Sequence, residues 1–300
     1  MLSRGKKKLR LKLKPAYLII FIFCIIITTG ATATCIINYI KNIFSTADAG
    51  IENPGILAAI ENKEWFQEIN MDYIELDEKN KIKINYLVLD EMSLYLVVDF
   101  ESQEDISEYT DVFFTDLKIT NEKGEIIGDL TRTINSEEIS RVNDKLIEKD
   151  KHNMKELIFI YTKEIPSSKT LNISFSKVKL ANHIGDMKEH SKKVDFQIDL
   201  IDKFINREVS NYTSLAKEIE KAVITETGFY AITSAEDFKK KKAKLIDENG
   251  KTYACQTFSL TYDNKMKTYK TMIVSDFDNK ENNKIKLIID NKKYELNKKT

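Results

Sequence analysis

A long uncharged stretch near the N-terminus constrains this chain more than any other feature of its sequence. Residues 16–37 form 22 consecutive positions without a charged side chain, and the run from Tyr17 to Ile27 is wholly apolar. At about 1.5 Å per residue, a helix of that length spans about 30 Å, the hydrocarbon thickness of a bilayer. We therefore predict a transmembrane helix over residues 16–40.

Positive charge around this stretch predicts its direction. Residues 1–15 contain seven basic side chains and no acidic one, whereas Lys41 is the only basic residue among the first dozen after residue 37. The positive-inside rule then places residues 1–15 in the cytoplasm, as a basic tail in contact with anionic lipid, and the remainder outside the cell. The membrane is therefore a predicted partner. The basic residues of the tail are Arg4, Lys6, Lys7, Lys8, Arg10, Lys12 and Lys14.

A cleaved signal peptide is the alternative interpretation, because a basic region followed by an apolar one is also its pattern. Acceptable cleavage motifs occur at Ala31-Thr-Ala33 and at Ser45-Thr-Ala47. A lipoprotein signal at Cys35 fits less well, because a threonine directly precedes the cysteine. All three interpretations put the bulk of the chain outside the cytoplasm. We prefer the retained anchor, because the apolar run is long enough to span the bilayer.

The composition of the outer part excludes two classes of protein. The whole chain has 47 basic and 47 acidic residues, so 40 basic residues face 47 acidic ones after the tail, a net charge of −7. An acidic domain is not attracted to polyphosphate, and we predict no binding of nucleic acid. Of three cysteines only Cys255 lies in the outer part, which therefore cannot be a disulfide scaffold.

Clear signals for local structure follow a predicted tether over residues 41–50. Asn53 and Pro54 have the residue types of an N-cap and first helical position, and an apolar stripe follows them, so we predict a short helix there. Next, apolar residues occupy every second position on either side of an Asp90-Glu91 turn, at Ile82, Ile84, Tyr86 and Val88, with Lys83 and Asn85 between them, and at Leu94, Leu96, Val98 and Phe100. That period of two predicts a hairpin with one buried face.

Shorter segments of the same character predict strands along the rest of the chain. Two other segments, Ser136–Lys149 and Tyr212–Val223, have apolar residues at helical spacing and are predicted to be helices. The predicted strands are Val112–Ile119, Glu125–Leu130, Glu156–Tyr161, Leu171–Leu180, Val194–Ile201, Gly228–Thr233, Lys242–Ile246, Lys251–Ser259, Tyr269–Val274 and Lys284–Ile289.

The spacing of these strands predicts a mainly β fold with two tandem antiparallel sandwich-like domains. Alternation lapses near Asp202–Asn211, so we place the domains at residues 51–203 and 204–300. A polar turn that ends in glycine occurs in both, at Leu117–Gly124 and at Ala243–Gly250. We expect each of these glycines to take a positive φ between two strands.

The sequence contains no pattern that indicates catalysis. The three histidines do not stand at metal-ligand spacing with cysteines, and nucleophile-elbow, zinc-protease and P-loop motifs are absent. Cys255 reads as a small buried residue, and Asp276–Asn283 lacks the order of a calcium loop. We therefore predict no catalytic, cofactor-binding or metal-binding residues and no cofactor. The histidines are His152, His183 and His190.

The order of these elements resembles a known family. Asn53–Asn62, Phe66–Asn70, the hairpin Ile82–Phe100 and the turn Asp116–Gly124 together resemble the bacterial membrane-anchored proteins that contain domain of unknown function 4179. The likeness covers about residues 50–200, and the remainder resembles the immunoglobulin-like domain that often follows. The resemblance implies a cell-surface sensing or binding module in a Gram-positive type of envelope. Members of the family are often the outer part of anti-sigma-factor-like proteins. Such proteins grip the sigma factor through a cytoplasmic helical segment, whereas here 15 residues, seven of them basic, precede the predicted anchor.

These observations favour a non-enzymatic envelope protein whose outer β-rich part binds or senses a wall component, another ligand or a partner protein. The alternative is a diverged anti-sigma-factor-type regulator that acts through a companion protein. A cell-envelope enzyme is the third hypothesis, and it lacks a visible acid–base or nucleophile constellation.

Overall fold

The computed structural model describes residues 36–41, 55–129, 140–162, 164–182, 186–235, 242–263 and 268–299. The tail (1–15), most of the predicted anchor (16–35) and most of the predicted tether (42–50) lie outside these residues. Among the described helices, none is long and apolar enough to cross a membrane. The described chain is mainly β, as predicted, and its strands form two sheets and one closed barrel.

The first sheet is antiparallel and contains the predicted hairpin. Its strand order is β1-β3-β4-β9-β8, and β2 pairs with the same strand as β1, namely β3. The hairpin is confirmed, with β3 paired to β4 from Asn80↔Ser102 to Leu89↔Leu94. The bounds are β1 Gln67–Glu68, β2 Ile74–Glu75, β3 Asn80–Leu89, β4 Ser93–Ser102, β8 Ser140–Lys149 and β9 Asn153–Thr162.

The prediction that this hairpin buries one face is wrong for β4. Leu94 to Val98 are all buried, including Tyr95 and Val97 at 1% exposure each. The reason is the position of β4, which lies inside the sheet between β3 and β9 and is covered on both sides. A short bulge between Ile84 and Tyr86 also shifts the alternation within β3.

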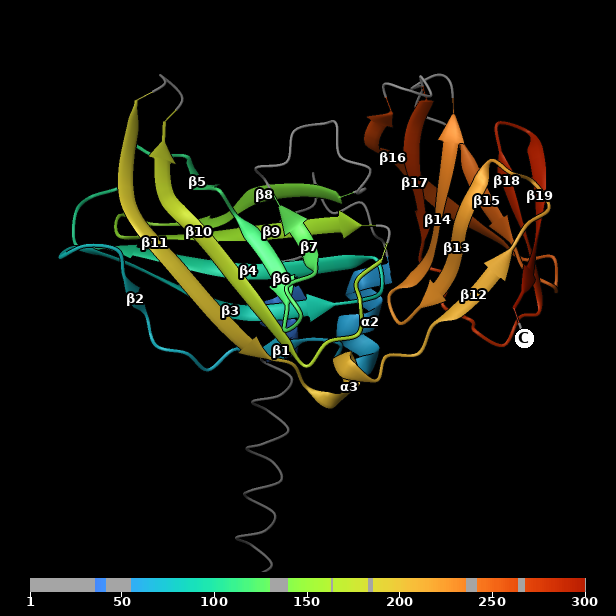
Figure 1. Cartoon of the computed structure of the whole chain (residues 1–300), viewed down its shortest axis with the longest axis horizontal. Helices are drawn as coiled ribbons and strands as arrows, with labels where there is room; N and C mark the ends of the chain where they lie inside the picture. Colours follow the sequence, from blue (N-terminus) through green and yellow to red (C-terminus); the bar gives the residue numbers. More distant parts are fainter. Residues whose placement is uncertain are drawn as a thin grey trace, which may run out of the picture.

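The second sheet crosses the first at a steep angle, and the two pack around a common core (Figure 1). Its order is β11-β10-β6-β7, and β5 pairs with the end of β10. The predicted strand Val112–Ile119 is two strands, because the backbone turns at Asp116, where φ is 57°. The bounds are β5 Asp111–Thr115, β6 Lys118–Asn121, β7 Ile126–Asp129, β10 Thr170–Ala181 and β11 Met187–Asp199. Together these two sheets form what we call the two-sheet unit.

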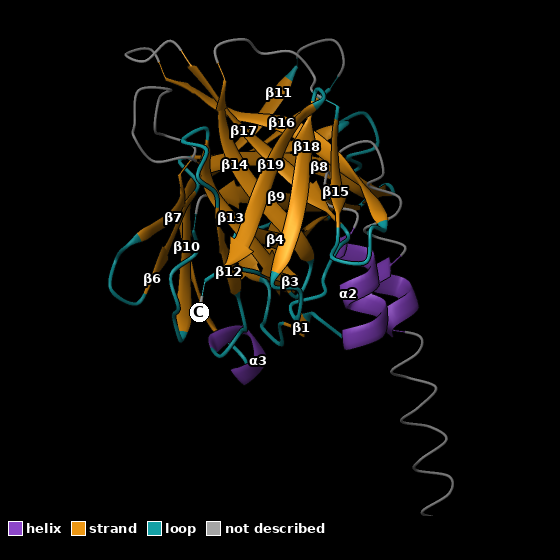
Figure 2. Cartoon of the chain, turned by 90° about the vertical axis from the view of Figure 1, so that its right-hand side faces the viewer, coloured by secondary structure: helices purple, strands orange, loops and turns teal. Residues whose placement is uncertain are grey.

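Helices contribute little to the fold. The predicted first helix is confirmed as α2, Gly55–Lys63, whose Ile56 and Ile60 are fully buried. Its predicted cap residues, Asn53 and Pro54, lie outside the described residues. Its core contacts continue through Trp65, whose indole donates a hydrogen bond to the carbonyl of Leu89 at 2.9 Å. Helix α3, Asp202–Ile205, follows the last strand of the two-sheet unit. Both helices lie at the same end of the molecule in two perpendicular views (Figures 1 and 2).

The remaining strands close into a barrel rather than the open immunoglobulin-like sandwich that we predicted. The order is β12-β13-β14-β17-β16-β15-β18-β19, and the pairs Tyr212↔Lys298 and Thr213↔Asn297 join the last strand to the first. Sequence periodicity identified the strands but not this pairing, which joins segments more than 80 residues apart. The bounds are β12 Ser210–Thr213, β13 Ile219–Thr225, β14 Gly228–Ala235, β15 Ala243–Ile246, β16 Thr252–Asp263, β17 Thr268–Ser275, β18 Lys284–Ile289 and β19 Lys292–Lys298.

Both additional helix predictions are wrong. Ser140–Lys149 is strand β8, paired with β9 along its whole length, and residues 136–139 lie outside the described residues. Tyr212–Val223 contains the end of β12 and the start of β13. In each case pairing with a neighbouring strand outweighs a weak helical spacing. Strand β19, Lys292–Lys298, was not predicted.

The repeated glycine turns have the predicted geometry. Gly124 and Gly250 have φ values of 79° and 80°, in the left-handed region that glycine adopts without a steric penalty. Each turn is also held by a side chain at its start. The Asn121 side-chain oxygen accepts from the backbone N–H of Glu125 at 2.9 Å, and Asp247 accepts from that of Lys251 at 2.8 Å.

Replacing the core residue Leu96 with alanine should lower the free energy of unfolding by about 2–5 kcal/mol, because the deletion leaves a cavity in a strand that is buried on both faces. Leu215→Ala is the matched control, since Leu215 is 102% exposed and should change stability by less than about 0.5 kcal/mol. Chemical denaturation of the detergent-solubilised chain, followed by tryptophan fluorescence, measures both. Equal effects would show that the core is placed wrongly.

Candidate functional site at the junction of the two units

The turn of the first hairpin meets the β13–β14 turn of the barrel through a buried carboxylate. Asp90 is 1% exposed and accepts hydrogen bonds from the Thr225 hydroxyl at 2.5 Å and from the Thr227 hydroxyl and backbone N–H. Burial raises the pKa of Asp90 above its ordinary value, while these hydrogen bonds oppose the shift. The carboxylate therefore joins the two-sheet unit to the turn between β13 and β14.

Apolar side chains extend this junction. Along β14, Phe229 and Ala231 point into the barrel, whereas Tyr230 and Ile232 point out and belong to the core of the two-sheet unit. The Tyr230 hydroxyl lies 3.0 Å from the Ser93 hydroxyl, and burial raises its pKa well above the ordinary value. The outer face of the barrel thus packs into the core of the two-sheet unit, whereas the barrel interior forms a second hydrophobic cluster. Three more barrel residues belong to the core of the two-sheet unit, namely Val223, Met272 and Val274.

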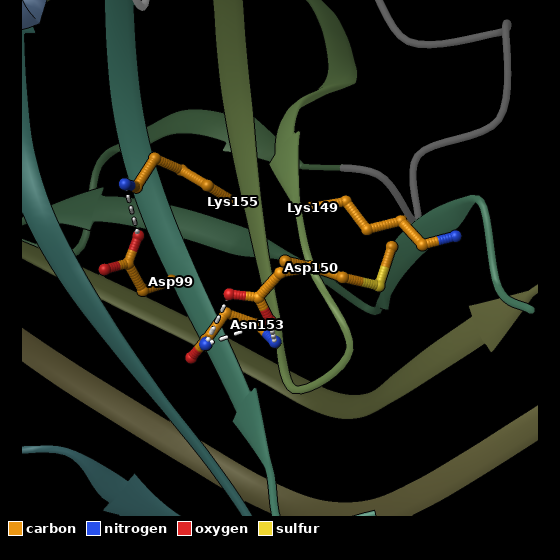
Figure 3. Close-up of a pocket in the computed structure, with 6 residues that line it drawn as sticks. Asp99, Lys149, Asp150, Asn153 and Lys155 are labelled. Carbon is orange, nitrogen blue, oxygen red and sulfur yellow. Dashed lines mark hydrogen bonds and ion pairs between the residues drawn. The ribbon is translucent and has the colours of Figure 1, made fainter. Parts of the chain in front are cut away.

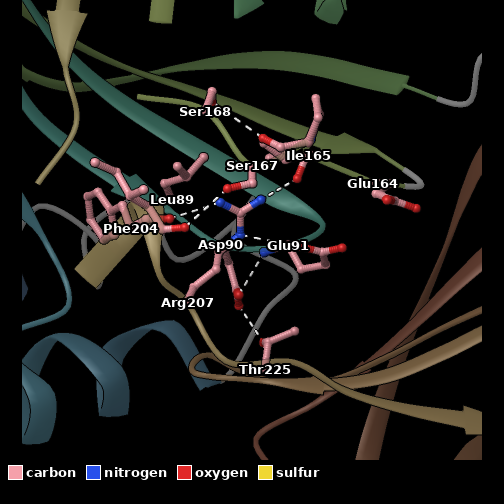
Figure 4. A network of polar contacts seen from close by, with 12 residues as sticks. Leu89, Asp90, Glu91, Glu164, Ile165, Ser167, Ser168, Phe204, Arg207 and Thr225 are labelled. Atoms are coloured by element: carbon pink, nitrogen blue, oxygen red, sulfur yellow. Dashed lines mark hydrogen bonds and ion pairs between the residues drawn. The ribbon is translucent and has the colours of Figure 1, made fainter. Parts of the chain in front are cut away.

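A second polar network lies beside Asp90 and has Arg207 at its centre (Figure 4). The Arg207 side chain is 4% exposed; it donates to the carbonyls of Phe204, at 2.9 Å, and Ile165, and lies 3.3 Å from a Glu91 oxygen. Lys221 of β13 contacts Glu91 at 3.6 Å and Glu164 at 3.0 Å. Burial raises the pKa of Glu91, although Arg207 and Lys221 oppose the rise. The network fixes Glu91 and Lys221 in place.

A polar cavity of about 480 Å³ opens next to this network, between β12, β13 and the segment that follows β9. One wall holds Glu91 and Lys221, and Glu164 stands at the rim with its side chain 63% exposed. Hydroxyl, amide and charged groups dominate, so the cavity offers both donors and acceptors to a polar ligand. The lining residues are Glu91, Glu164, Asn211, Tyr212, Thr213, Ser214, Ile219, Glu220, Lys221, Ala222 and Lys299.

A second hollow, of about 240 Å³, lies at the β8–β9 turn and is less suited to a ligand (Figure 3). Asp150 accepts hydrogen bonds from Asn153 within the turn itself, and Lys149 donates to the carbonyls of Ser107 and Tyr109. Lys155 lies 3.8 Å from Asp99. These polar side chains already bind one another, so the hollow is a feature of the turn.

Of the residues that the sequence singled out, Cys255 and His190 lie apart from the junction, whereas Asp278 lies beside it and shares Lys63 with Glu226 of the β13–β14 turn. Cys255 is in β16, and burial raises its pKa to about 12, which leaves the thiol protonated. His190 lies in β11, 2.6 Å from Asp77, whereas His183 lies outside the described residues. Asp278 pairs with Lys63 at 2.9 Å. Among the described residues, no three potential ligands gather in a way that could hold a metal ion.

Sequence reasoning missed the junction residues Asp90 and Arg207. Asp90 read as an ordinary turn residue, and Arg207 lay in the predicted boundary. One sequence feature did indicate the junction. Phe229–Ile232 is a run of four consecutive apolar residues without alternation, the pattern of a strand that is buried on both faces. That pattern indicates a covered outer face on β14, although not its partner.

The fold and the cavity define a two-unit β protein with a polar cavity where the units meet. No protein-family model matches the chain, and no curated protein matches it. A solved structure, a conserved domain protein from Bacillus anthracis, is similar with a TM-score of 0.50 and 13% sequence identity. The match covers 76% of this chain and 78% of that chain. At this identity the likeness concerns the fold alone.

Proposed function

We propose that this protein is a single-pass membrane protein whose β-rich part lies outside the cell and binds or senses a polar ligand, without catalysis. The uncharged stretch at residues 16–37 and the seven basic residues before it support the anchor and its direction. The resemblance to the proteins with domain of unknown function 4179 supports a location in a bacterial envelope.

The observation that carries the binding function is the junction cavity. Its walls come from both units, and the Arg207 network holds Glu91 and Lys221 in fixed positions. A preorganised polar site binds a ligand without the cost of ordering its own side chains. The lining contains neither histidine nor cysteine, and its carboxylates are paired with lysine or arginine, which favours binding over chemistry.

The mixture of groups suits a wall fragment that carries both hydroxyl and charged groups. Glu164 can accept from an ammonium or hydroxyl group, because its exposed side chain is held by a single lysine. Thr213, Ser214 and Asn211 add neutral polar groups along the same wall. A cell-wall glycopeptide has this chemistry, and we take it as the ligand class to test.

The Glu164→Gln variant should bind purified bacterial cell-wall sacculi about tenfold more weakly than the wild type, because the change removes one charge-assisted hydrogen bond. Co-sedimentation of the detergent-solubilised full-length chain with sacculi measures this. Since the Glu164 side chain is 63% exposed, its replacement should leave the fold intact.

Asp195→Asn is the matched control for that measurement. Asp195 is 62% exposed and pairs with Lys193 at 3.2 Å, so it resembles Glu164 in exposure and partner, but it does not line the junction cavity. Wild-type affinity is expected for this variant. If both variants bind sacculi like the wild type, the junction cavity is not the binding site, and if the wild type does not sediment, wall glycopeptide is the wrong ligand class.

A further inference from the structure

Residues 36–41, which we call the docking turn, are helical and contact the two-sheet unit. Ile40 is fully buried and belongs to the same core as β4, and Ile36 packs against that core. The predicted anchor ends at residue 40, so its last turn is in contact with the β-rich part instead of lying free.

Polar and aromatic contacts hold the docking turn on three different elements. The Tyr39 ring lies 6.1 Å from the ring of Tyr86 on β3, and the Lys155 ammonium of β9 lies 5.0 Å from the centre of the Tyr39 ring. Lys41 pairs with Glu61 of α2 at 2.8 Å. Lys155 also contacts the Tyr39 hydroxyl, so that one ammonium group contacts both the ring and the hydroxyl of this tyrosine.

We propose that the docking turn joins the anchor and the β-rich part into one rigid body, so that the protein presents a fixed face to the membrane. The inference rests on the proposed anchor. A helix that runs from the bilayer into a buried contact transmits the orientation of one end to the other, because a helix is stiff over a few turns. The face around Tyr86 and Lys155 is then the one held nearest to the lipid.

This arrangement has a consequence for the junction cavity. A rigid connection fixes the direction in which the cavity opens relative to the membrane, and it allows a rearrangement of the two-sheet unit to reach the anchor. A flexible tether would do neither, because the chain between residue 36 and residue 55 could span about 25 Å in random directions.

Distance measurements between two spin labels test the inference in the full-length chain. The labels are placed at Asn38→Cys, on the exposed side of the docking turn, and Lys193→Cys, whose side chain is 75% exposed, with Cys24, Cys35 and Cys255 replaced by alanine. In nanodiscs the wild-type background should give one narrow distance distribution. Ile40→Asp should widen it to a spread on the order of 20 Å, because the turn is released.

Two further variants distinguish release of the docking turn from unfolding of the two-sheet unit. Ile40→Val keeps the buried contact and should keep the narrow distribution, whereas Tyr39→Ala, at a position 38% exposed, removes the ring contacts without placing a charge in the core and should widen it. Unchanged tryptophan fluorescence from Trp65 shows that the unit remains folded. A wild-type distribution as broad as that of Ile40→Asp overturns the inference.

Flotation of the same chain with liposomes tests the proposed anchor separately from the rigid connection. Chains that float and give a broad distribution contradict the rigid connection alone. Chains that give a narrow distribution but do not float contradict the anchor, and with it the coupling to the membrane. Chains that float with a narrow distribution support both.

Discussion

Replacing Asp90 with alanine should lower the free energy of unfolding by about 3 kcal/mol or more, because the change leaves buried donors without their acceptor. The Thr225 and Thr227 hydroxyls and the Thr227 and Glu91 backbone N–H groups all donate to Asp90. Denaturant titration followed by Trp65 fluorescence detects the loss of stability, since the Trp65 indole donates a hydrogen bond to the carbonyl of Leu89, the residue before Asp90.

Asp195→Ala is the control, because its carboxylate is 62% exposed and should contribute less than about 0.5 kcal/mol. An Asp90→Ala midpoint equal to that of the control would mean that the junction does not stabilise the fold. Far-ultraviolet circular dichroism should follow the same transition as Trp65 fluorescence, because the outer face of the barrel packs into the core of the two-sheet unit and the two units are expected to unfold together.

The Asp90→Asn variant tests the charge of the same residue through pH. The pKa of Asp90 is raised by burial above its ordinary value of 3.8, so the folded state favours the protonated carboxyl group. Its contribution to stability is present below about pH 3.8 and is lost as the pH rises through the folded pKa. The asparagine does not titrate, so the stability of the variant relative to the wild type should increase from acidic to neutral pH. A constant difference would contradict the raised pKa.

The second large effect is expected at Gly228, in the turn that carries the Thr225 and Thr227 donors. Its φ is 123°, and an added Cβ would lie 2.1 Å from the backbone oxygen of Ser275. Because that oxygen belongs to the neighbouring strand β17, the clash cannot be relieved by a side-chain rotation. Gly228→Ala should therefore destabilise the fold by about 3 kcal/mol or more, measured as a fall in the denaturation midpoint.

Gly124→Ala and Gly250→Ala are matched controls for this substitution. Both glycines have a positive φ, but nothing lies within 4 Å of a Cβ added at either position. Each control should cost only about 1–2 kcal/mol, the penalty for a left-handed conformation. If all three variants lose the same stability, the close approach of β14 and β17 is incorrect.

The sequence was most informative where a structure depends on neighbours along the chain. The hairpin of β3 and β4, the helix α2 and the turns at Gly124 and Gly250 follow from alternation, capping residue types and glycine, and all four were predicted. It was least informative for β8, where ten residues with a weak helical spacing form a strand, because pairing with β9, which begins four residues after β8 ends, outweighs that spacing.

The sequence by itself therefore determined that this protein is mainly β, which residues form most strands, and where the apolar stretch for an anchor lies. Only the tertiary structure decided that the last eight strands close into a barrel, that β4 and β14 are buried on both faces, and that Asp90 and Arg207 meet their partners at the junction. The physical reason is the separation along the sequence of the residues that must interact. Periodicity and turn chemistry act over a few residues, whereas closure, double burial and a shared carboxylate depend on contacts between segments more than 80 residues apart.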